Sequence, residues 1–534
     1  MAVTSPAAPR TGARLRARRL HVSAFVLAGL VTAAVLMPPA YLLFRASEGG
    51  ATIVDTLTRP SAVAAMWRTV LLTTTVTAAC IAVAVPLAWL VMRTDLPFAR
   101  VWIALLTLPL AVPSFVGGFV MISALGPGGL VQDLLEPFGV QRLPSIYGFP
   151  GAWLVLTVLS YPYVFLQCCA ALRRENPSLE EAARGLGKGA WTTFFRVNLP
   201  QLRPAISAGG ILVALYVLSE FGAVSMLRYD TLTPLVYIQY TTQFDRTGAA
   251  VLGLPLILMA VALLAADGLT RNRSRYHAQG QRRVPKQLRL GGWRWPAIVA
   301  CLVPLVLGVV VPVGVLVYWL AAGLLQGARV ALPLEVFLNT AQVAGAAAVV
   351  SVLASMPLAW VSVRHRGWLS TLMERASYSG QALPAITIAL SLVFFATRFA
   401  APLYQTLGLL VFAYTVRFLP EALGATRTSL LQVNPNGEEA ARSLGAGTMK
   451  TLARVTAPQM LPGVSAGALL VLLTVMKELP ITLLLSPTGY TTFATLIWST
   501  ASEAFFARAA LPSLVLLLLS GVAVLVMLRR EESA

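Results

Sequence analysis

One polar segment occurs twice in this chain, and the two copies lie 258 residues apart. The first copy, residues 176–200, has the sequence NPSLEEAARGLGKGAWTTFFRVNLP, and the second, residues 434–458, has the sequence NPNGEEAARSLGAGTMKTLARVTAP. Apolar membrane helices can resemble one another through composition alone, but polar segments of this length have no such reason to agree. The chain is therefore predicted to contain two copies of one module.

The composition is that of a membrane protein. Of the 534 residues, 57% are hydrophobic and 12% are charged, whereas soluble proteins carry about 25% charged residues. An all-α integral membrane protein is predicted, because twelve apolar segments approach the roughly 20 residues that a helix needs to cross a bilayer. These spans are expected near residues 21–44, 63–92, 101–125, 148–172, 204–228, 249–269, 296–325, 335–363, 376–397, 403–431, 462–486 and 508–528. The first is too long for a cleavable signal peptide and lacks a small-residue cleavage site, so we expect it to be retained.

The placement of basic residues predicts the orientation. The net charge is +20, and arginines gather in the N-terminal tail, in residues 270–295 and after the last span. Because no folded basic domain is present, this pattern indicates the positive-inside rule and not a nucleic-acid partner. With the N-terminus in the cytoplasm, the two polar copies and the C-terminus also fall inside. Each half then has an even number of spans, so the two modules are predicted to lie parallel.

The similarity between the halves extends beyond the polar segments. Matches at the same offset continue from Pro204 to Glu220, and the tetrapeptide Pro-Leu-Ala-Trp at 86–89 recurs at 357–360, with an offset of 271. This predicts the following division: 1–62, basic tail and first span; 63–269, first module; 270–295, basic cytoplasmic linker; 296–334, seventh span and outer loop; 335–528, second module; and 529–534, cytoplasmic tail.

The repeated segment has the features of two short helices joined by a turn. Glu180 and Glu181 would lie in the first turn, where acidic side chains complement the helix dipole. Gly187 allows the chain to reverse where a helix ends, and Pro200 is expected to close the unit before the next span. Such a protrusion is suited to docking into a groove on another protein. The alternative is a surface helix pair that only covers the ends of spans four and five.

The spacing resembles the EAA loop of ABC-importer permeases. The motif consists of Glu-Ala-Ala, three residues, Gly, nine residues and a hydrophobic-x-Leu-Pro ending, and Ala457 stands where the family usually has Leu. In the family, this loop sits in a cleft of a cytoplasmic ATPase and transmits its closure to the membrane helices. The resemblance implies two parallel type I ABC-importer permease modules in one chain, with ATPase-coupling residues Glu181, Ala182, Ala183, Gly187 and Pro200 in the first copy and Glu439, Ala440, Ala441, Gly445 and Pro458 in the second.

The same resemblance implies partner proteins. Two loops imply two copies of a cytoplasmic ABC ATPase, and importers of this kind take cargo from an extracytoplasmic substrate-binding protein or lipoprotein. The chain has no phosphate-binding loop of its own, so we expect no catalytic residue and no bound cofactor, with ATP and Mg used by the partner ATPase. His21, His277 and His365 are scattered, so no metal site is expected. The expected location is the cytoplasmic (inner) membrane of a bacterium, with both termini in the cytoplasm.

Finer resemblance concerns the cargo. The segments 219–225 (SEFGAVS) and 476–480 (MKELP), followed by Pro-Thr-Gly at 487–489 and Ala-Ser-Glu at 501–503, are similar to the fused twelve-span permeases for ferric iron. Fused permeases for thiamine and phosphonate compounds share this organisation and remain alternatives. A secondary transporter also has twelve spans in parallel halves, but it would not need a duplicated polar segment between spans four and five. A membrane-embedded enzyme is disfavoured by the scattered histidines and the lack of a nucleophile constellation.

Glu220 and Glu478 are the candidate residues of the substrate path. Each lies about sixteen residues beyond the proline that opens its predicted span, which corresponds to roughly 24 Å along a helix. Intramembrane carboxylates are costly and usually line a polar route or find a partner. We therefore predict that they help to pass a cationic or oxygen-ligated cargo. The alternative is that each carboxylate binds loop backbone where its helix ends, since Gly222 and Pro480 follow closely.

Overall fold

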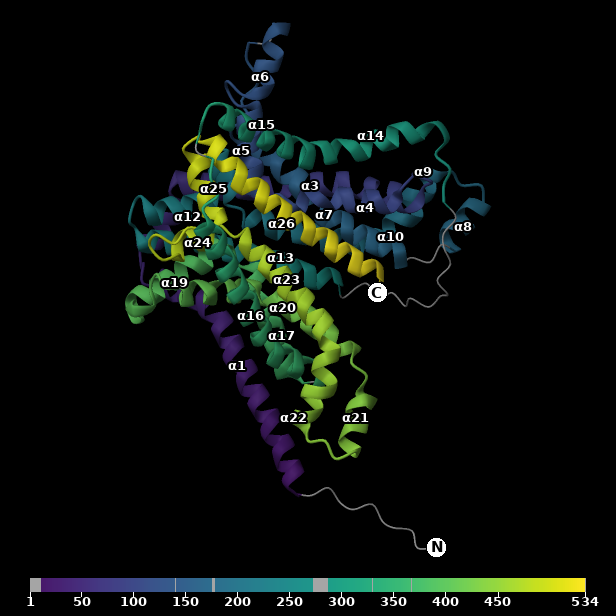
Figure 1. Ribbon diagram of the computed structural model, residues 1–534, viewed down its shortest axis with the longest axis vertical. Helices are drawn as coiled ribbons and strands as arrows, with labels where there is room; N and C mark the ends of the chain where they lie inside the picture. Colours follow the sequence, from purple (N-terminus) through teal and green to yellow (C-terminus); the bar gives the residue numbers. More distant parts are fainter. Residues whose placement is uncertain are drawn as a thin grey trace. The chain divides into compact units, whose positions relative to one another are not determined.

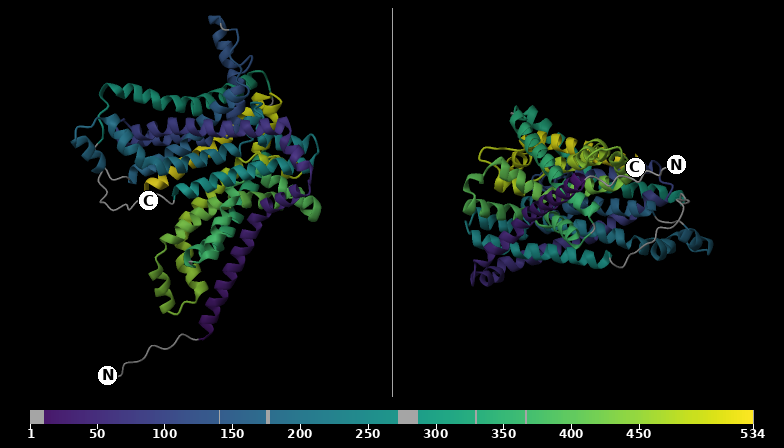
Figure 2. Two further views of the ribbon diagram at one scale, coloured as in Figure 1. Left: turned by 180° about the vertical axis from the view of Figure 1, so that it is seen from behind. Right: turned by 90° about the horizontal axis from the view of Figure 1, so that it is seen from below.

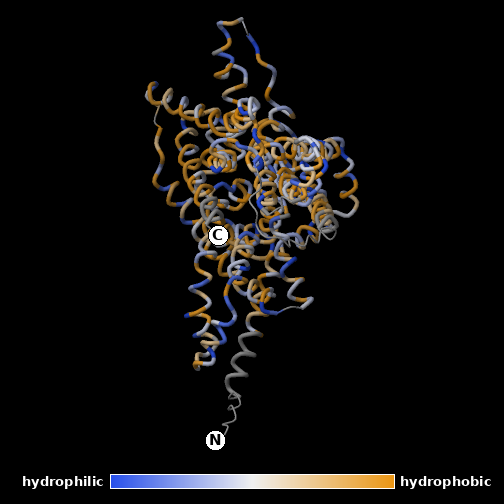
Figure 3. Tube along the Cα trace, turned by 90° about the vertical axis from the view of Figure 1, so that its right-hand side faces the viewer, coloured by the Kyte–Doolittle hydropathy of each residue, from blue (hydrophilic) through white to orange (hydrophobic). Residues whose placement is uncertain are grey.

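The computed structural model describes residues 11–139, 141–174, 178–271, 287–328, 330–365 and 367–533. Within these ranges the regular structure is helical, apart from one isolated bridge between Thr94 and Leu288. Eleven helices are long and apolar enough to cross a membrane, and the bent pair Trp368–Gln381 and Ala385–Phe399 adds a twelfth candidate. The long helices are mainly hydrophobic in Figure 3, with hydrophilic residues most evident at helix ends and connections. The predicted all-α membrane fold is confirmed.

The helices of the first half begin with the first span and end at the linker (Figure 1). They are α1 (Thr11–Ser47), α2 (Thr52–Thr58), α3 (Pro60–Arg93), α4 (Ala99–Thr107), η1 (Leu108–Ala111), α5 (Ser114–Leu125), α6 (Leu130–Leu135), η2 (Glu136–Phe138), α7 (Phe149–Arg174), α8 (Ser178–Gly185), α9 (Ala190–Thr193), η3 (Phe194–Asn198), α10 (Leu199–Leu218), α11 (Gly222–Met226), α12 (Leu232–Thr241) and α13 (Arg246–Arg271).

The helices of the second half follow the linker. They are η4 (Gly291–Trp293), α14 (Arg294–Leu305), η5 (Val306–Val310), α15 (Val311–Leu325), α16 (Leu334–Arg364), α17 (Trp368–Ser377), α18 (Ser379–Ala382), α19 (Ala385–Phe399), η6 (Ala401–Leu403), α20 (Leu407–Gln432), α21 (Pro435–Ser443), α22 (Thr448–Thr451), η7 (Leu452–Thr456), α23 (Ala457–Met476), α24 (Pro480–Leu485), α25 (Phe493–Ser502) and α26 (Phe506–Ser533).

The helices form two compact units that do not follow the order of the chain. The larger unit contains Leu42–Phe337, Pro384–Thr387 and Thr491–Ala534, and the smaller unit contains Met1–Tyr41, Leu338–Leu383 and Ile388–Tyr490. In the larger unit, α14 and α15 of the second half pack against α4 and α5 of the first. In the smaller unit, the first span packs against the second half, as the contact of the Phe25 and His365 rings at 5.2 Å illustrates. Each half therefore contributes its leading span to a unit built mainly from the other half.

Helix boundaries reproduce the duplication. At an offset of 258 residues, α7 corresponds to α20 and α10 to α23 from first residue to last. The two pairs also pack closely through a glycine. A Cβ built on Gly209 would lie 2.7 Å from the Val164 Cα, and one on Gly467 would lie 2.7 Å from the Ala425 Cβ. These distances are too short for a side chain, so glycine allows the same close helix crossing in both copies.

The third span of each half is broken at a proline. Helix α5 starts after Pro113 and α19 starts after Pro384, which lie 271 residues apart. Proline has no N–H to donate and interrupts a helix at this point. The uninterrupted third span expected over 101–125 is therefore wrong, because Val112 and Pro113 separate two helical pieces. The offset changes from 271 to 258 because α6 and η2 lengthen the outer connection of the first copy, whereas η6 alone fills that of the second.

The fifth and eleventh spans begin earlier and end earlier than predicted. The apolar helices run over Trp191–Leu218 and Met449–Met476, whereas the sequence predicts spans over 204–228 and 462–486. Glu220 and Glu478 consequently lie in the turns that follow these helices, and the expectation that they lie within a span helix is wrong. The reason is local, since short separate helices, α11 and α24, begin directly after each turn.

The end of the linker is tied to the cytoplasmic end expected for α3. The Leu288 amide donates to the Arg93 carbonyl at 2.8 Å, and the Asp95 amide donates to the Leu288 carbonyl at 3.0 Å. The Leu290 amide also donates to the Asp95 carboxylate at 2.9 Å. Residues 272–286, which form most of the predicted linker, lie outside the described residues. Residues 287–290 form a strap that holds the start of the second half against the loop after α3.

Candidate functional site

The two copies of the polar segment fold as helix-turn-helix hairpins. The first hairpin (residues 178–200) contains α8 and α9, the second hairpin (residues 435–458) contains α21 and α22, and each lies at one end of the long helices to which it connects (Figures 1 and 2). Asn176 and Pro177, which open the predicted first copy, lie outside the described residues.

Each hairpin turns at a glycine in the left-handed conformation. Gly187 has a φ of +74° and Gly445 a φ of +86°. The amide directly after each turn glycine bonds back to the preceding helix, with Lys188 donating to the Ala183 carbonyl at 3.1 Å and Ala446 donating to the Ala441 carbonyl at 3.0 Å. This is the hydrogen-bond pattern of a Schellman motif, in which glycine is favoured because it lacks a Cβ. The chain reversal predicted at Gly187 is confirmed, and Gly445 makes the same turn in the second copy.

The second helix of each hairpin continues into the membrane span. Helix α9 passes through the π-helical turn η3 into α10, and α22 passes through the π-helical turn η7 into α23. The expectation that Pro200 closes the hairpin before the span is therefore wrong. A π-helical turn absorbs an extra residue, and it lies here beside prolines whose missing N–H groups weaken the regular helical ladder. Pro458 occupies the same place in the second copy.

The first glutamate of each Glu-Glu pair is buried and anchors its hairpin. Glu180 is 5% exposed and Glu438 is 4% exposed. Glu181 and Glu439, which belong to the Glu-Ala-Ala motif, are exposed. Neighbouring residues on a helix point about 100° apart, so one glutamate faces the protein while the other faces outward. A buried carboxylate needs partners, because an uncompensated charge is costly.

In the first hairpin, the partners of Glu180 come from three helical segments. Arg93, the last residue of α3, places its Nε 3.3 Å from Glu180 Oε2, and the Arg93 side chain is only 1% exposed. Asn198 in η3 donates from Nδ2 to the same oxygen at 3.2 Å. Arg184, one turn further along α8, pairs with Oε1. The carboxylate therefore joins α8 to both α3 and η3.

In the second hairpin, Glu438 makes the corresponding contacts. Arg364, the last residue of α16, places Nη2 2.7 Å from Glu438 Oε1. Thr456 in η7 donates from its hydroxyl to the same oxygen at 2.9 Å. Arg442, one turn along α21, lies 3.3 Å from Oε2. We call each set of contacts a hairpin network: Glu180 with Arg93, Arg184 and Asn198, and Glu438 with Arg364, Arg442 and Thr456.

The repeated Pro-Leu-Ala-Trp tetrapeptide lies beside these networks. Trp89 packs edge-on against Phe194, with ring centroids 5.4 Å apart, and stacks near Trp191 at 6.5 Å. In the second copy, the Arg364 guanidinium lies over the Trp360 ring, 5.7 Å from its centroid. Each tryptophan precedes the network arginine by four residues, one helical turn, and in the second copy its ring lies under the arginine of the ion pair.

The motif residues left exposed form the outer surface of each hairpin. In addition to Glu181 and Glu439, the side chains of Ala182 and Ala440 are exposed. Large apolar side chains accompany them. Leu186 is 80% exposed and Trp191 71% in the first hairpin, and the equivalent Leu444 and Met449 are 88% and 61% exposed in the second. Exposed apolar side chains grouped with polar ones are typical of a protein interaction surface.

Glu220 and Glu478 make the backbone contacts considered as the alternative to a path role. Glu220, 6% exposed, accepts a hydrogen bond from the Ala223 amide at 2.9 Å, and Glu478 accepts one from the Ile481 amide at 3.4 Å. Each carboxylate thus caps the short helix that follows. The two residues belong to different compact units, and their role in a substrate path stays a prediction.

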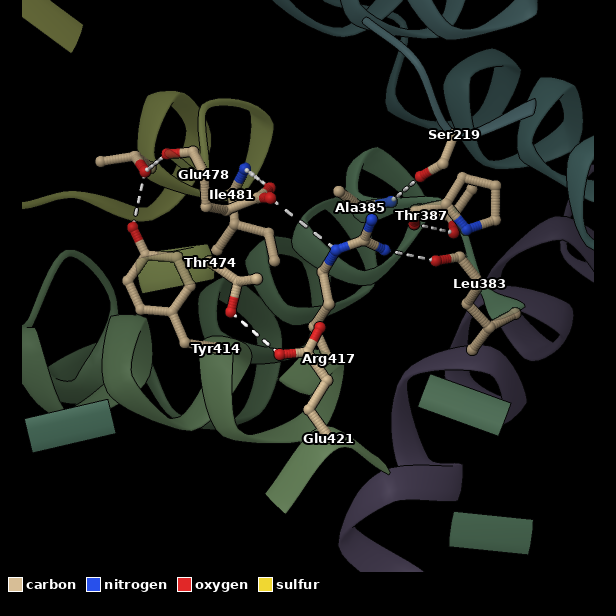
Figure 4. A network of polar contacts seen from close by, with 12 residues as sticks. Ser219, Leu383, Ala385, Thr387, Tyr414, Arg417, Glu421, Thr474, Glu478 and Ile481 are labelled. Atoms are coloured by element: carbon tan, nitrogen blue, oxygen red, sulfur yellow. Dashed lines mark hydrogen bonds and ion pairs between the residues drawn. The ribbon is translucent and has the colours of Figure 1, made fainter. Parts of the chain in front are cut away.

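The second copy has additional partly buried charges that the sequence prediction did not assign to a site. Figure 4 shows Arg417 between the Leu383 carbonyl, to which it donates at 2.7 Å, and Glu478, whose Oε2 lies 3.8 Å from Arg417 Nε. One turn along α20, Glu421 accepts a hydrogen bond from the Thr474 hydroxyl at 3.0 Å. At the equivalent positions of the first copy, Leu159 and Tyr163 replace Arg417 and Glu421. The surroundings of the two path candidates therefore differ.

The hairpins and their two modules agree with a known family of transport proteins. The family model of binding-protein-dependent transport system inner membrane components matches residues 81–276 and 347–530. The chain belongs to this family and carries two copies of its permease module. The predicted class, a multi-span transport subunit of an ABC system, is confirmed.

Relatives match the whole chain or one module. The Fe(3+)-transport system permease protein FbpB 2 of Haemophilus influenzae is 34% identical over 510 residues, which cover 93% of this chain and 96% of that protein. The sulfate transport system permease protein CysW of Escherichia coli is 30% identical and covers 46% of this chain and 82% of its own. The molybdenum transport system permease protein ModB of Escherichia coli is 32% identical, with coverages of 38% and 93%.

Proposed function

We propose that this chain is the membrane-spanning permease subunit of an ATP-driven importer. Two copies of a cytoplasmic ATPase bind it, one at each hairpin, and an extracytoplasmic binding protein or lipoprotein delivers the cargo. Both hairpins and both termini lie in the cytoplasm, in agreement with the positive-inside rule. The observation that carries this proposal is the pair of hairpins with the same turn, the same buried glutamate and the same exposed motif surface.

Transport follows an alternating-access cycle in this proposal. ATP, with Mg, draws the two ATPases together, and the surfaces around Glu181 and Glu439 move with them. The path then opens outward to receive cargo, and hydrolysis returns it to the inward state. The chain itself supplies binding and transmission of movement and holds no nucleotide.

Ferric iron is the cargo that we propose. The support comes from FbpB 2, a relative that is matched over nearly its whole length. The sulfate and molybdenum permeases are matched over one module only, so they support the module's general function more than a particular cargo. Thiamine and phosphonate compounds are the alternatives that the sequence resemblance leaves.

Native mass spectrometry of the complex and uptake by proteoliposomes test this function. We expect two ATPase copies per chain, and uptake of ⁵⁵Fe that requires both internal ATP and the iron-loaded binding protein. Uptake by vesicles that lack any ATPase would contradict the importer assignment. Labelled thiamine, phosphonate, sulfate and molybdate serve as alternative cargoes in the same assay. ATP-dependent uptake of one of them without iron uptake would make that compound the cargo in place of ferric iron.

A further inference from the structure

We propose that the two hairpin networks are the link through which each hairpin moves a second membrane helix, α3 in the first copy and α16 in the second. This inference rests on the proposed function and assigns Arg93 and Arg364 as positioning residues. They act on the transport cycle through Glu180 and Glu438 and need not touch cargo or nucleotide. The exposed motif surface would receive the movement of the ATPase, and the buried network would pass it on.

The leading helix of each hairpin is held by its buried glutamate. Helix α8 is separated from α9 by the Gly187 turn, so the continuous helix α9–η3–α10 does not include it. Its buried carboxylate instead contacts Arg93 and Asn198. One contact leads to α3 and the other to η3. A displacement of α8 therefore acts on two membrane helices at once.

Each network arginine is the last residue of a long helix. Arg93 ends α3, a helix of 34 residues, and Arg364 ends α16, a helix of 31 residues. At 1.5 Å per residue, such helices are about 45–50 Å long, enough to cross the membrane completely. A contact at the last residue acts on the end of one continuous helix, in which Pro86 or Pro357 removes a single ladder hydrogen bond. The movement of a hairpin can consequently reach the opposite face of the membrane.

The ion pair between the network arginine and the buried glutamate occurs in both copies. The hairpins recur at an offset of 258 residues, whereas Arg93 and Arg364 lie 271 residues apart. The ion pair is thus present in both copies even though the spacing between its two partners differs by 13 residues. The third contact also persists through a change of side chain, since Asn198 in one copy and Thr456 in the other both donate to the carboxylate. The hydrogen bond at this position recurs although the donor side chain differs.

The test replaces each network arginine by methionine, which has a similar length and no charge. We expect Arg93→Met and Arg364→Met, in the complex with its ATPase and binding protein, to retain two ATPases per chain. Uptake of ⁵⁵Fe per ATP hydrolysed should fall at least tenfold. The matched control is Arg68→Met, at the other end of α3, where the arginine makes an exposed ion pair with Asp230 at 3.4 Å. The Arg68→Met variant should retain the normal uptake of ⁵⁵Fe per ATP hydrolysed.

Conservative variants distinguish a loss of coupling between hydrolysis and uptake from a failure of the chain to fold. Arg93→Lys keeps the charge and should restore at least part of the coupling ratio. If the methionine variants do not assemble, Arg93→Gln and Arg364→Gln carry the test, because glutamine can still donate a hydrogen bond to the buried carboxylate but loses the charge, with an expected two- to fivefold fall in uptake per ATP. A normal ratio in the methionine variants, or in this second pair where the first does not assemble, would overturn the inference. Absence of ATPase binding to the unmodified chain would instead overturn the proposed function.

Discussion

At the scale of single residues, burial assigns different roles to side chains that are neighbours in sequence. Glu180 and Glu181 lie on the same short helix, but only Glu180 is enclosed by two arginines. Removing its carboxylate would break a buried ion pair, which costs about 3–5 kcal/mol. Exposed substitutions usually change stability by less than about 0.5 kcal/mol, so Glu181 is available for binding a partner.

Glu220 and Glu478 provide a prediction at this scale. A glutamine keeps an oxygen that can accept from the Ala223 or Ile481 amide, but it removes the charge. If the carboxylates line the cargo path, Glu220→Gln should lower ⁵⁵Fe uptake at least tenfold with an unchanged melting temperature. Glu478→Gln should lower uptake to the same extent and should in addition weaken the ion pair with Arg417. Glu220→Leu should in addition lower stability by about 1–3 kcal/mol, because the buried Ala223 amide loses its acceptor.

Uptake assays and thermal unfolding in detergent give the two readouts of this prediction. Normal uptake in both glutamine variants would remove the path role and leave the capping contact as the function of these carboxylates. The two variants need separate measurement, because Arg417 lies near Glu478 and a leucine occupies the equivalent position in the first copy.

At the scale of elements, the hairpin shows what local sequence determines. The glycine turn and the acidic first turn follow from residues close in the chain, and both could be predicted. The burial of Glu180 could not, because it depends on Arg93, which reaches the site from 87 residues away. One signal was available, since Glu180 and Glu438 match at the hairpin offset and Arg93 and Arg364 match at the offset of the Pro-Leu-Ala-Trp repeat.

The turn glycines provide the prediction for this scale. A Cβ at Gly187 or Gly445 would meet no heavy atom within 4 Å, so a substitution acts through the positive φ and not through a clash. Valine disfavours this conformation, at a cost above the 1–2 kcal/mol typical of L-residues, whereas asparagine tolerates it. We expect Gly187→Val and Gly445→Val to reduce uptake per ATP hydrolysed. Gly187→Asn and Gly445→Asn should retain the normal uptake per ATP hydrolysed.

Membrane content and coupling ratio are the measurements for the turn variants. The chain should remain in the membrane at its usual amount, because the altered turn lies outside the spans. Coupling that survives both valine substitutions would contradict a role of the hairpin turn in transmission.

At the scale of the whole molecule, the sequence predicts the number of spans and the duplication but not how the halves share helices. Hydropathy identifies apolar segments without saying which of them pack together. The first span and the seventh both precede a module in the chain, yet each packs in the compact unit built mainly from the other half. The broken third spans were missed for a related reason, since an apolar segment with a proline can be a bent helix or two helices. The predicted module limits, 63–269 and 335–528, stay a prediction.

The strap of residues 287–290 has a consequence for dividing the protein genetically. Because Leu288 and Leu290 already bind the loop after α3, a cut after Gly280 would leave this attachment on the C-terminal polypeptide. Co-expressed fragments 1–280 and 281–534 should therefore co-purify and restore uptake, whereas a C-terminal fragment that starts at Gly291 should be recovered in smaller amount. Equal recovery of the two C-terminal fragments would mean that the strap is dispensable and that helix packing alone holds the two polypeptides together.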